Sequence, residues 1–175
     1  MPVDTEVLAQ LPLFQSLSTT ELEEIASRME PQSLGPERGL IREGDPPGHP
    51  IFVLLTGSVE VVKRGLDGRG RIISTLQAPS VFGEIEILAK RPAIASVNTV
   101  SDVTLAILSR GEFDEMCQMN RPAALKLVRN LAQVLSYRLA AADERLAAQF
   151  DFAGSRDAQS LAKLREVLYV GWRPK

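Results

Sequence analysis

Cysteine, histidine and aromatic residues are scarce in this 175-residue chain, which has one cysteine, one histidine and 5% aromatic residues. The single thiol, Cys117, cannot form an internal disulfide or supply a thiolate cage for a metal. His49 lies in the turn PPGHP with no partner ligands near it. We therefore expect no metal or haem site. We interpret Cys117 as a semi-buried core residue rather than a redox sensor, and His49 as a solvated loop residue.

Long hydrophobic runs and concentrated charge are also missing. No apolar run approaches the about 20 residues of a membrane span, and the first residues lack the basic start and apolar core of a secretory signal. The formal net charge is -2, with scattered Lys and Arg, whereas non-specific nucleic-acid binding needs a concentrated basic face. We expect a cytoplasmic protein with no membrane span and no DNA partner.

Local patterns divide the chain into helical ends and a β-rich middle. Residues 1–30 read as an N-terminal helical segment, in which Ser18 is an N-cap with Glu21 three residues on. Over residues 31–110, Gly and Pro punctuate short Val-, Ile- and Leu-rich runs, which is typical of strands and turns. Asp67-Gly68 marks a hairpin. The pattern predicts a mainly β fold with flanking helices, built on a closed or sandwich-like β-roll.

Residues 111–149 return to helical patterns. Ser109 and Glu112 form a capping-box pattern, and Pro122 stands where a first helical turn accepts it. The long helix predicted over residues 122–149 carries apolar residues three and four apart: Val128, Leu131, Leu135, Leu139, Ala142 and Leu146. Such a stripe must be buried, either against the chain's own β-roll or against a twin helix of a homodimer. Residues 150–175 are expected to form a short helical tail, amphipathic over 158–170.

The segment FGEIEILAKRPAIASV, residues 82–97, resembles the phosphate-binding cassette of cyclic-nucleotide-binding domains. In the family pattern, Phe-Gly-Glu precedes a helical turn, an Arg, small residues and Val. Here the Arg position falls on Ala93. Further matches occur in the family order at 42–45, 51–61 and 107–113, so the resemblance covers about residues 11–146. It implies a catabolite-activator-like sensor domain, a jelly-roll barrel with a long C-terminal helix and a degenerate cassette. Too few residues follow Gln149 for a helix-turn-helix DNA-binding domain.

The cassette's residue types suit a cyclic phosphate. Gly83 lets the backbone approach the ligand, and N–H groups at the start of a helical turn attract an anion. Glu84 can accept a hydrogen bond from a ribose hydroxyl, and Ser96 can donate to the phosphate or to a base edge. Losing a hydrogen bond to a charged group costs about 1.5–3 kcal/mol, so Ala93 implies an affinity roughly ten- to a hundred-fold lower. The resemblance assigns these ligand-binding residues: Phe82, Gly83, Glu84, Ile85, Arg91, Ala93, Ala95 and Ser96.

Three further positions qualify this assignment. Arg91 can swing toward the gap at position 93, although Pro92 stiffens the segment between them. Glu86 replaces a small apolar residue of the family pattern; it either repels an anion or faces solvent and pairs with Lys90. On the long helix, Leu139 and Ala140 are expected near the base of the nucleotide. They can stack on a ring but cannot read its edges.

Two functions follow from this reading. The first is a regulatory sensor module that weakly binds cyclic AMP, cyclic GMP or another small anionic effector, and signals to a protein partner through movement of the C-terminal helix. The alternative is a non-binding protein-interaction scaffold with a vestigial pocket. We expect no catalytic residue and no cofactor, because the acid pairs Glu84/Glu86 and Glu23/Glu24 have no nucleophile or metal-ligating His nearby.

Overall fold

The N-terminal helical segment consists of three short helices. The structure, a computed structural model, describes residues 3–89 and 91–153. It begins with α1 (Thr5–Gln10), the 3-10 helix η1 (Pro12–Phe14) and α2 (Thr19–Ser27). The capping box at α2 is confirmed, because the Glu21 N–H donates to Ser18 Oγ at 3.3 Å and the Ser18 N–H donates to Glu21 Oε2 at 2.6 Å. These caps divide the segment, so it does not run as one helix.

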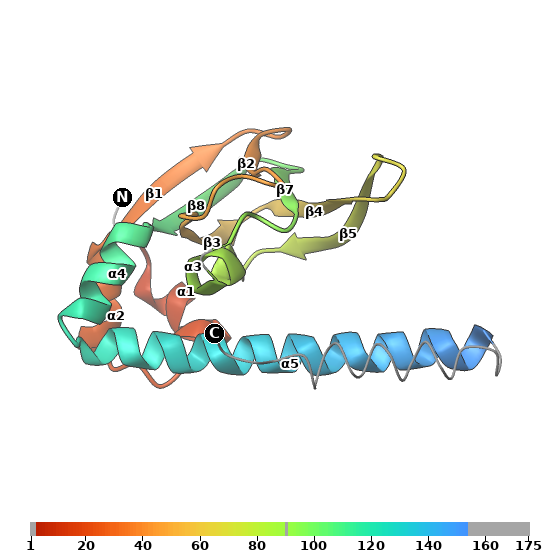
Figure 1. Cartoon of the computed structure of the whole chain (residues 1–175). Helices are drawn as coiled ribbons and strands as arrows, with labels where there is room; N and C mark the ends of the chain where they lie inside the picture. Colours follow the sequence, from red (N-terminus) through yellow and green to blue (C-terminus); the bar gives the residue numbers. More distant parts are fainter. Residues whose placement is uncertain (1–2, 90, 154–175) are drawn as a thin grey trace. The chain divides into compact units, whose positions relative to one another are not determined.

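Two antiparallel four-stranded sheets make up the middle of the described chain (Figure 1). The first sheet has the order β1 (Met29–Leu34), β8 (Val103–Leu108), β3 (Ile51–Thr56), β6 (Ser80–Phe82). The second has the order β2 (Gly39–Ile41), β7 (Ser96–Thr99), β4 (Ser58–Arg64), β5 (Gly70–Gln77). The predicted hairpin at Asp67-Gly68 joins β4 to β5, and Gly68 has a φ of +75°. The predicted β-roll with flanking helices is confirmed.

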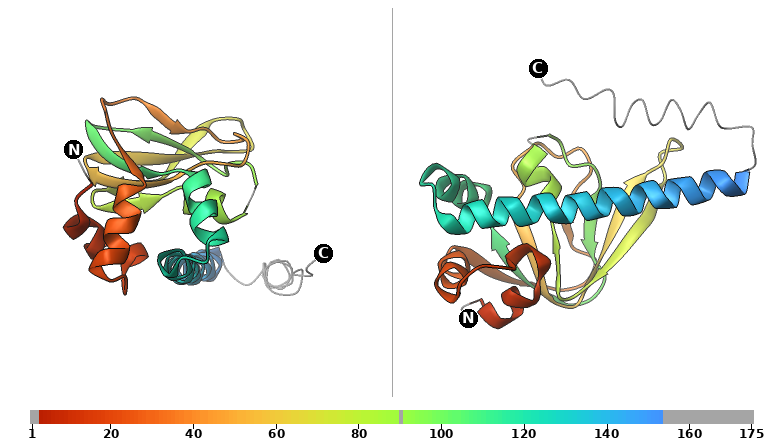
Figure 2. Two further views of the ribbon diagram at one scale, coloured as in Figure 1. Left: turned by 90° about the vertical axis from the view of Figure 1, so that its left-hand side faces the viewer. Right: turned by 90° about the horizontal axis from the view of Figure 1, so that it is seen from below.

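Strand β3 is buried on both faces and separates two apolar clusters. Phe52 and Leu54 point into the space between the sheets, which we call the inter-sheet core. Ile51 and Val53 point to the other side, into a helix-side core. The Phe52 ring stacks on Phe82 with a centroid separation of 4.9 Å. This alternation follows from the period of two along a strand, and Figure 2 shows the two sheets as facing layers.

The helix-side core joins the N-terminal helices to α4 (Arg110–Gln118) and to the first turns of α5 (Pro122–Ala153). Figure 1 shows α1, α2 and α4 gathered at one end of the sheets. From α5 the buried residues are Ala123, Ala124, Leu127 and Leu131. Val128, the first residue of the predicted stripe, is exposed in the single chain, so its burial against a twin helix stays a prediction. Leu127 lies four residues before Leu131, on the same face of the helix, and both side chains are buried in the helix-side core.

Beyond Val134 the helix belongs to a second compact unit, which begins at Leu135. There Leu139 is 53% exposed, and Tyr137 is also exposed. The helix continues to Ala153, four residues past its predicted end. The side chains of Ala142 and Leu146 and the predicted tail at 158–170 lie outside the described residues. Pairing of this helix between two copies therefore stays a prediction. No described helix has the length and apolarity needed to cross a membrane.

A buried asparagine ties the N-terminal segment to α5. Asn130 Nδ2 donates to the Leu13 carbonyl at 2.9 Å and to the Gln15 carbonyl at 2.7 Å. Lys126, one turn earlier on α5, contacts Glu21 at 2.6 Å. The Asn130 amide and the Leu13 carbonyl satisfy each other at a buried position, where an unpaired polar group would be costly. The N-terminal segment and the start of α5 are therefore held together by polar contacts as well as by the helix-side core.

Replacing Asn130 tests this tie. We expect Asn130→Ala to lower the free energy of unfolding by about 1–3 kcal/mol, because the Leu13 carbonyl loses its donor inside the protein. Gln133→Ala, at an exposed position of the same helix, is the matched control and should change stability by less than about 0.5 kcal/mol. Urea denaturation measures both. Equal unfolding midpoints for the two variants would contradict the assignment.

Candidate functional site

The first half of the cassette turns tightly into a short helix. Gly83 lies between β6 and α3 (Glu84–Ala89) and has a φ of +83°. A Cβ added at Gly83 would lie 2.3 Å from the Pro50 carbonyl oxygen. Only glycine permits both this backbone conformation and this close approach. The turn brings Glu84 to a buried position at the first residue of α3, where a carboxylate can accept hydrogen bonds from a ligand hydroxyl.

The second half of the cassette is joined to the loop of residues 42–50, which connects β2 to β3 and is called here the β2–β3 loop. The Ala93 N–H donates to the Asp45 carbonyl and the Ala93 carbonyl accepts from the Gly44 N–H, both at 2.9 Å. The Ala93 side chain is 4% exposed and belongs to the inter-sheet core. The position where the family pattern has arginine thus contributes a methyl group to apolar packing.

Ser96 connects the cassette to a charged cluster. The Glu43 N–H donates to Ser96 Oγ at 2.9 Å. The Glu43 carboxylate accepts from Lys63 Nζ at 2.6 Å and from the Arg64 N–H at 2.8 Å. Lys63 also donates to the Ile94 carbonyl. The hydrogen bond from Lys63, followed by the one from Arg64, lowers the pKa of Glu43, so this carboxylate is ionised at neutral pH.

The predicted cassette residues differ in how deeply they are buried. Phe82, Gly83, Glu84 and Ala95 are buried, and Ile85 and Ser96 are half-buried. They belong to the two halves of the cassette that pack on the β-roll. Arg91 is exposed, and within the described part of the chain it makes no hydrogen bond or ion pair. The structure therefore does not place Arg91 in the gap at position 93.

Two parts of the predicted site are not placed against the cassette. Leu139 and Ala140 lie on the exposed surface of α5, in the unit that begins at Leu135, so their role near a base stays a prediction. Lys90 and the side chain of Glu86 lie outside the described residues.

The sequence did not indicate that Lys63 and the Glu43 carboxylate form a charged pair beside the cassette. The turn that contains Glu43 matches the family pattern. However, the hydrogen bond from Glu43 to Ser96 joins residues 53 positions apart, and local patterns do not reveal such a contact.

The lone cysteine and histidine have ordinary surroundings. Cys117 is half-buried and free, as predicted, and burial raises the pKa of its thiol. His49 is half-buried rather than solvated, and its Nε2 lies 3.7 Å from Oδ2 of Asp45 in the same loop. Among the described residues, no three His, Cys, Asp or Glu side chains gather as metal ligands would.

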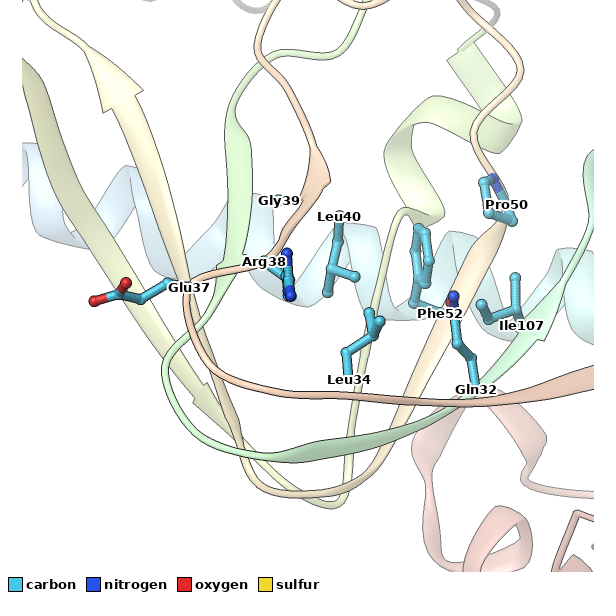
Figure 3. Close-up of a pocket in the computed structure, with 9 residues that line it drawn as sticks. All are labelled: Gln32, Leu34, Glu37, Arg38, Gly39, Leu40, Pro50, Phe52 and Ile107. Carbon is cyan, nitrogen blue, oxygen red and sulfur yellow. The ribbon is translucent and has the colours of Figure 1, made fainter.

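A separate pocket of about 610 Å³ opens between the edge strands β1 and β2 (Figure 3). Its apolar walls include Leu34, Leu40 and Ile107. Figure 3 shows the Glu37 side chain pointing away from it. None of its lining residues belongs to the cassette. This pocket is therefore distinct from the predicted phosphate site.

Comparisons with known proteins agree with the predicted family and fold. Residues 31–120 match the family model described as the cyclic nucleotide-binding domain. A crystal structure of a cyclic nucleotide-binding domain from Methylobacillus flagellatus is similar, with a TM-score of 0.73 and 25% identity, covering 83% of this chain and 81% of that one. The regulatory domain of Toxoplasma gondii PKA, crystallised with cAMP, has a TM-score of 0.59 and 30% identity over 63% of this chain and 42% of that one.

A curated relative extends beyond this chain. The CRP-like cAMP-activated global transcriptional regulator of Mycobacterium tuberculosis is 24% identical over 142 residues, which cover 81% of this chain and 61% of that protein. The chain thus spans less than two thirds of that relative's length.

The close approach at Gly83 can be tested by adding a methyl group. We expect Gly83→Ala to destabilise the protein by about 2–4 kcal/mol, because it adds a collision with the Pro50 backbone to the strain of a positive φ. Gly68→Ala is the control, since Gly68 also has a positive φ but has open space around it. It should cost only about 1 kcal/mol. Chemical denaturation of both variants gives the difference, and equal losses would refute the close approach.

Proposed function

Since this chain belongs to the cyclic nucleotide-binding domain family, we propose that it is a regulatory sensor module that weakly binds cyclic AMP, cyclic GMP or another small anionic effector. The observation that carries this proposal is that the β2–β3 loop contacts both halves of the cassette. Gly83 lies against Pro50, and Ala93 is hydrogen-bonded to Gly44 and Asp45. These contacts do not depend on the side chain at position 93, where the family pattern has arginine.

The groups that remain suit part of a nucleotide. The buried Glu84 carboxylate fits a ribose hydroxyl, and the Ser96 hydroxyl has its own proton to donate to a phosphate oxygen. Ala93 offers neither charge nor donor. A missing charge-assisted bond costs about 1.5–3 kcal/mol, which corresponds to a ten- to hundred-fold weaker affinity. Because some ligand-binding groups remain and one charged donor is missing, we expect weak binding of a cyclic nucleotide. The same remaining groups could also bind a small anionic effector of a different shape.

The cassette helix and the start of the C-terminal helix share one apolar core. Ile87, on the cassette helix α3, is buried in the helix-side core together with Leu127 and Leu131 of α5. Because cores are close-packed, a shift of α3 must be absorbed by its neighbours. We propose that ligand binding moves α3 and repacks the start of α5, and that a protein partner reads this change.

The alternative function, a scaffold with a vestigial pocket, also has an observation in its favour. Ala93 is buried among apolar residues. Ser96, Glu43 and Lys63 already satisfy one another through hydrogen bonds. A chain that no longer binds a nucleotide would keep such contacts for stability alone. Binding measurements separate the two functions.

Restoring the arginine is the direct test. In calorimetric titrations with cyclic AMP and cyclic GMP, we expect weak binding to the wild-type chain and roughly ten- to a hundred-fold tighter binding to Ala93→Arg. Gln118→Arg adds the same charge at an exposed position of α4 and should bind as the wild type does. If neither wild type nor a folded Ala93→Arg binds either nucleotide, the cyclic-nucleotide proposal fails and the scaffold is favoured.

The proposed homodimer through residues 122–149 has its own test. Leu139 is an exposed apolar residue on α5, and a partner helix would bury it. Light scattering should give twice the 19.1-kDa mass of the chain. Leu139→Asp should return the single-chain mass, whereas Gln133→Asp, a polar exposed position, should leave the dimer intact. A wild type that scatters as a single chain at all concentrations would contradict the proposal.

A further inference from the structure

A lysine contacts the cassette immediately beyond the missing arginine. Lys63 stands near the end of β4, and its Nζ donates to the carbonyl of Ile94, the residue that follows Ala93. The same Nζ contacts Glu43 Oε1 at 2.6 Å. An ammonium on this carbonyl brings a positive charge to the half of the cassette that contains Ser96.

Glu43 occupies the groups that an incoming anion would use. Its backbone N–H donates to Ser96 Oγ, and its carboxylate accepts from both Lys63 Nζ and the Arg64 N–H. An ammonium and a backbone N–H are also the usual donors to a phosphate oxygen. The Glu43 side chain is only 20% exposed. The protein thus holds a carboxylate of its own beside the cassette.

We propose that Lys63 replaces the missing cassette arginine as the counter-charge for the ligand, and that Glu43 occupies Lys63 in the ligand-free protein. The inference rests on the proposed function, because it assigns the charge balance of that same site. The ligand's phosphate takes the place of the Glu43 carboxylate on Lys63, while Ser96 donates its hydroxyl proton. Two anions on one ammonium repel each other, so Glu43 acts as an internal competitor.

Replacing the Glu43 carboxylate by a phosphate on Lys63 would affect the β2–β3 loop, because Glu43 belongs to that loop. Glu43 precedes Gly44 and Asp45, whose backbone groups bond to Ala93. When its carboxylate leaves Lys63, the loop loses one of its ties to β4 but keeps its backbone bonds to the cassette. Ligand binding at this site therefore changes how the loop is held, which gives Glu43 control over both affinity and loop order.

The ordinary alternative is that the ion pair only ties the loop to β4. Partly exposed ion pairs contribute little to stability, so the three substitutions below leave the fold intact. Glu43→Gln keeps an oxygen that accepts from the Arg64 N–H and removes the negative charge. Lys63→Gln removes the positive charge, and Lys63→Arg keeps it. The pair can thus be altered one charge at a time.

The experiment is a calorimetric titration of cyclic AMP into wild type, Glu43→Gln, Lys63→Gln, Lys63→Arg and Ala93→Arg. We expect Glu43→Gln to bind about ten-fold more tightly than wild type, and Lys63→Gln about ten-fold more weakly. Lys63→Arg should keep at least the wild-type affinity. The double variant Glu43→Gln/Lys63→Gln should resemble Lys63→Gln, because Glu43 acts through Lys63.

Two controls isolate the charge effect. Arg64→Gln removes a neighbouring charge of β4 while leaving its backbone N–H, and should change affinity by less than about two-fold. Adenosine, which has no phosphate, should bind Glu43→Gln, Lys63→Gln and wild type with equal affinity. An equal change for adenosine and cyclic AMP would overturn the inference, since the substitutions would then act on the pocket in general.

The outcomes separate this inference from the proposed function. If wild type binds cyclic AMP and Lys63→Gln binds equally well, Lys63 is not the counter-charge, although the sensor function stands. If only Ala93→Arg binds, the pocket accepts the nucleotide but Lys63 does not replace the arginine. If no variant binds, Ala93→Arg included, the proposed function and this inference fall together.

Discussion

The β2–β3 loop determines where the cassette lies, because it holds the cassette at both ends. At one end, the Pro50 carbonyl leaves space only for the hydrogen of Gly83. At the other, Gly44 and Asp45 pair with the backbone of Ala93. Neither contact depends on the side chain at position 93. Both contacts therefore form with alanine at this position. Glu84 directly follows the first contact, and Ser96 lies three residues beyond the second.

Shape and charge are separate properties of this site. The backbone contacts supply the shape, whereas charge balance depends on a few side chains that differ from the family pattern. Ala93 stands where the family pattern has a positively charged arginine. Glu43 and Lys63 form an ion pair with no net charge. A neutral pair attracts an anion much less than a free guanidinium does. This charge balance supports the proposal of weak binding. Ile87 of α3 is buried in the same helix-side core as Leu127 and Leu131 of α5.

Features set by neighbouring residues could be predicted from the sequence, and features set by distant residues could not. The strands at Ile51–Thr56 and Ser58–Arg64, the hairpin at Asp67-Gly68 and the cap at Ser18 follow from local patterns. Which face of α5 packs on the β-roll could not be predicted, because helical spacing fits Leu127 and Val128 equally well until the core is known. The bond of Glu43 to Ser96 depends on the β-roll bringing distant segments together.

The most direct test of a preserved cassette is an amide NMR titration of the wild-type chain with cyclic AMP. Chemical-shift changes report contacts even when binding is too weak for a reliable heat signal. We expect changes concentrated at the amides of Gly83, Glu84, Glu43 and Ser96. Changes spread over the surface, or confined to the pocket between β1 and β2, would contradict this expectation.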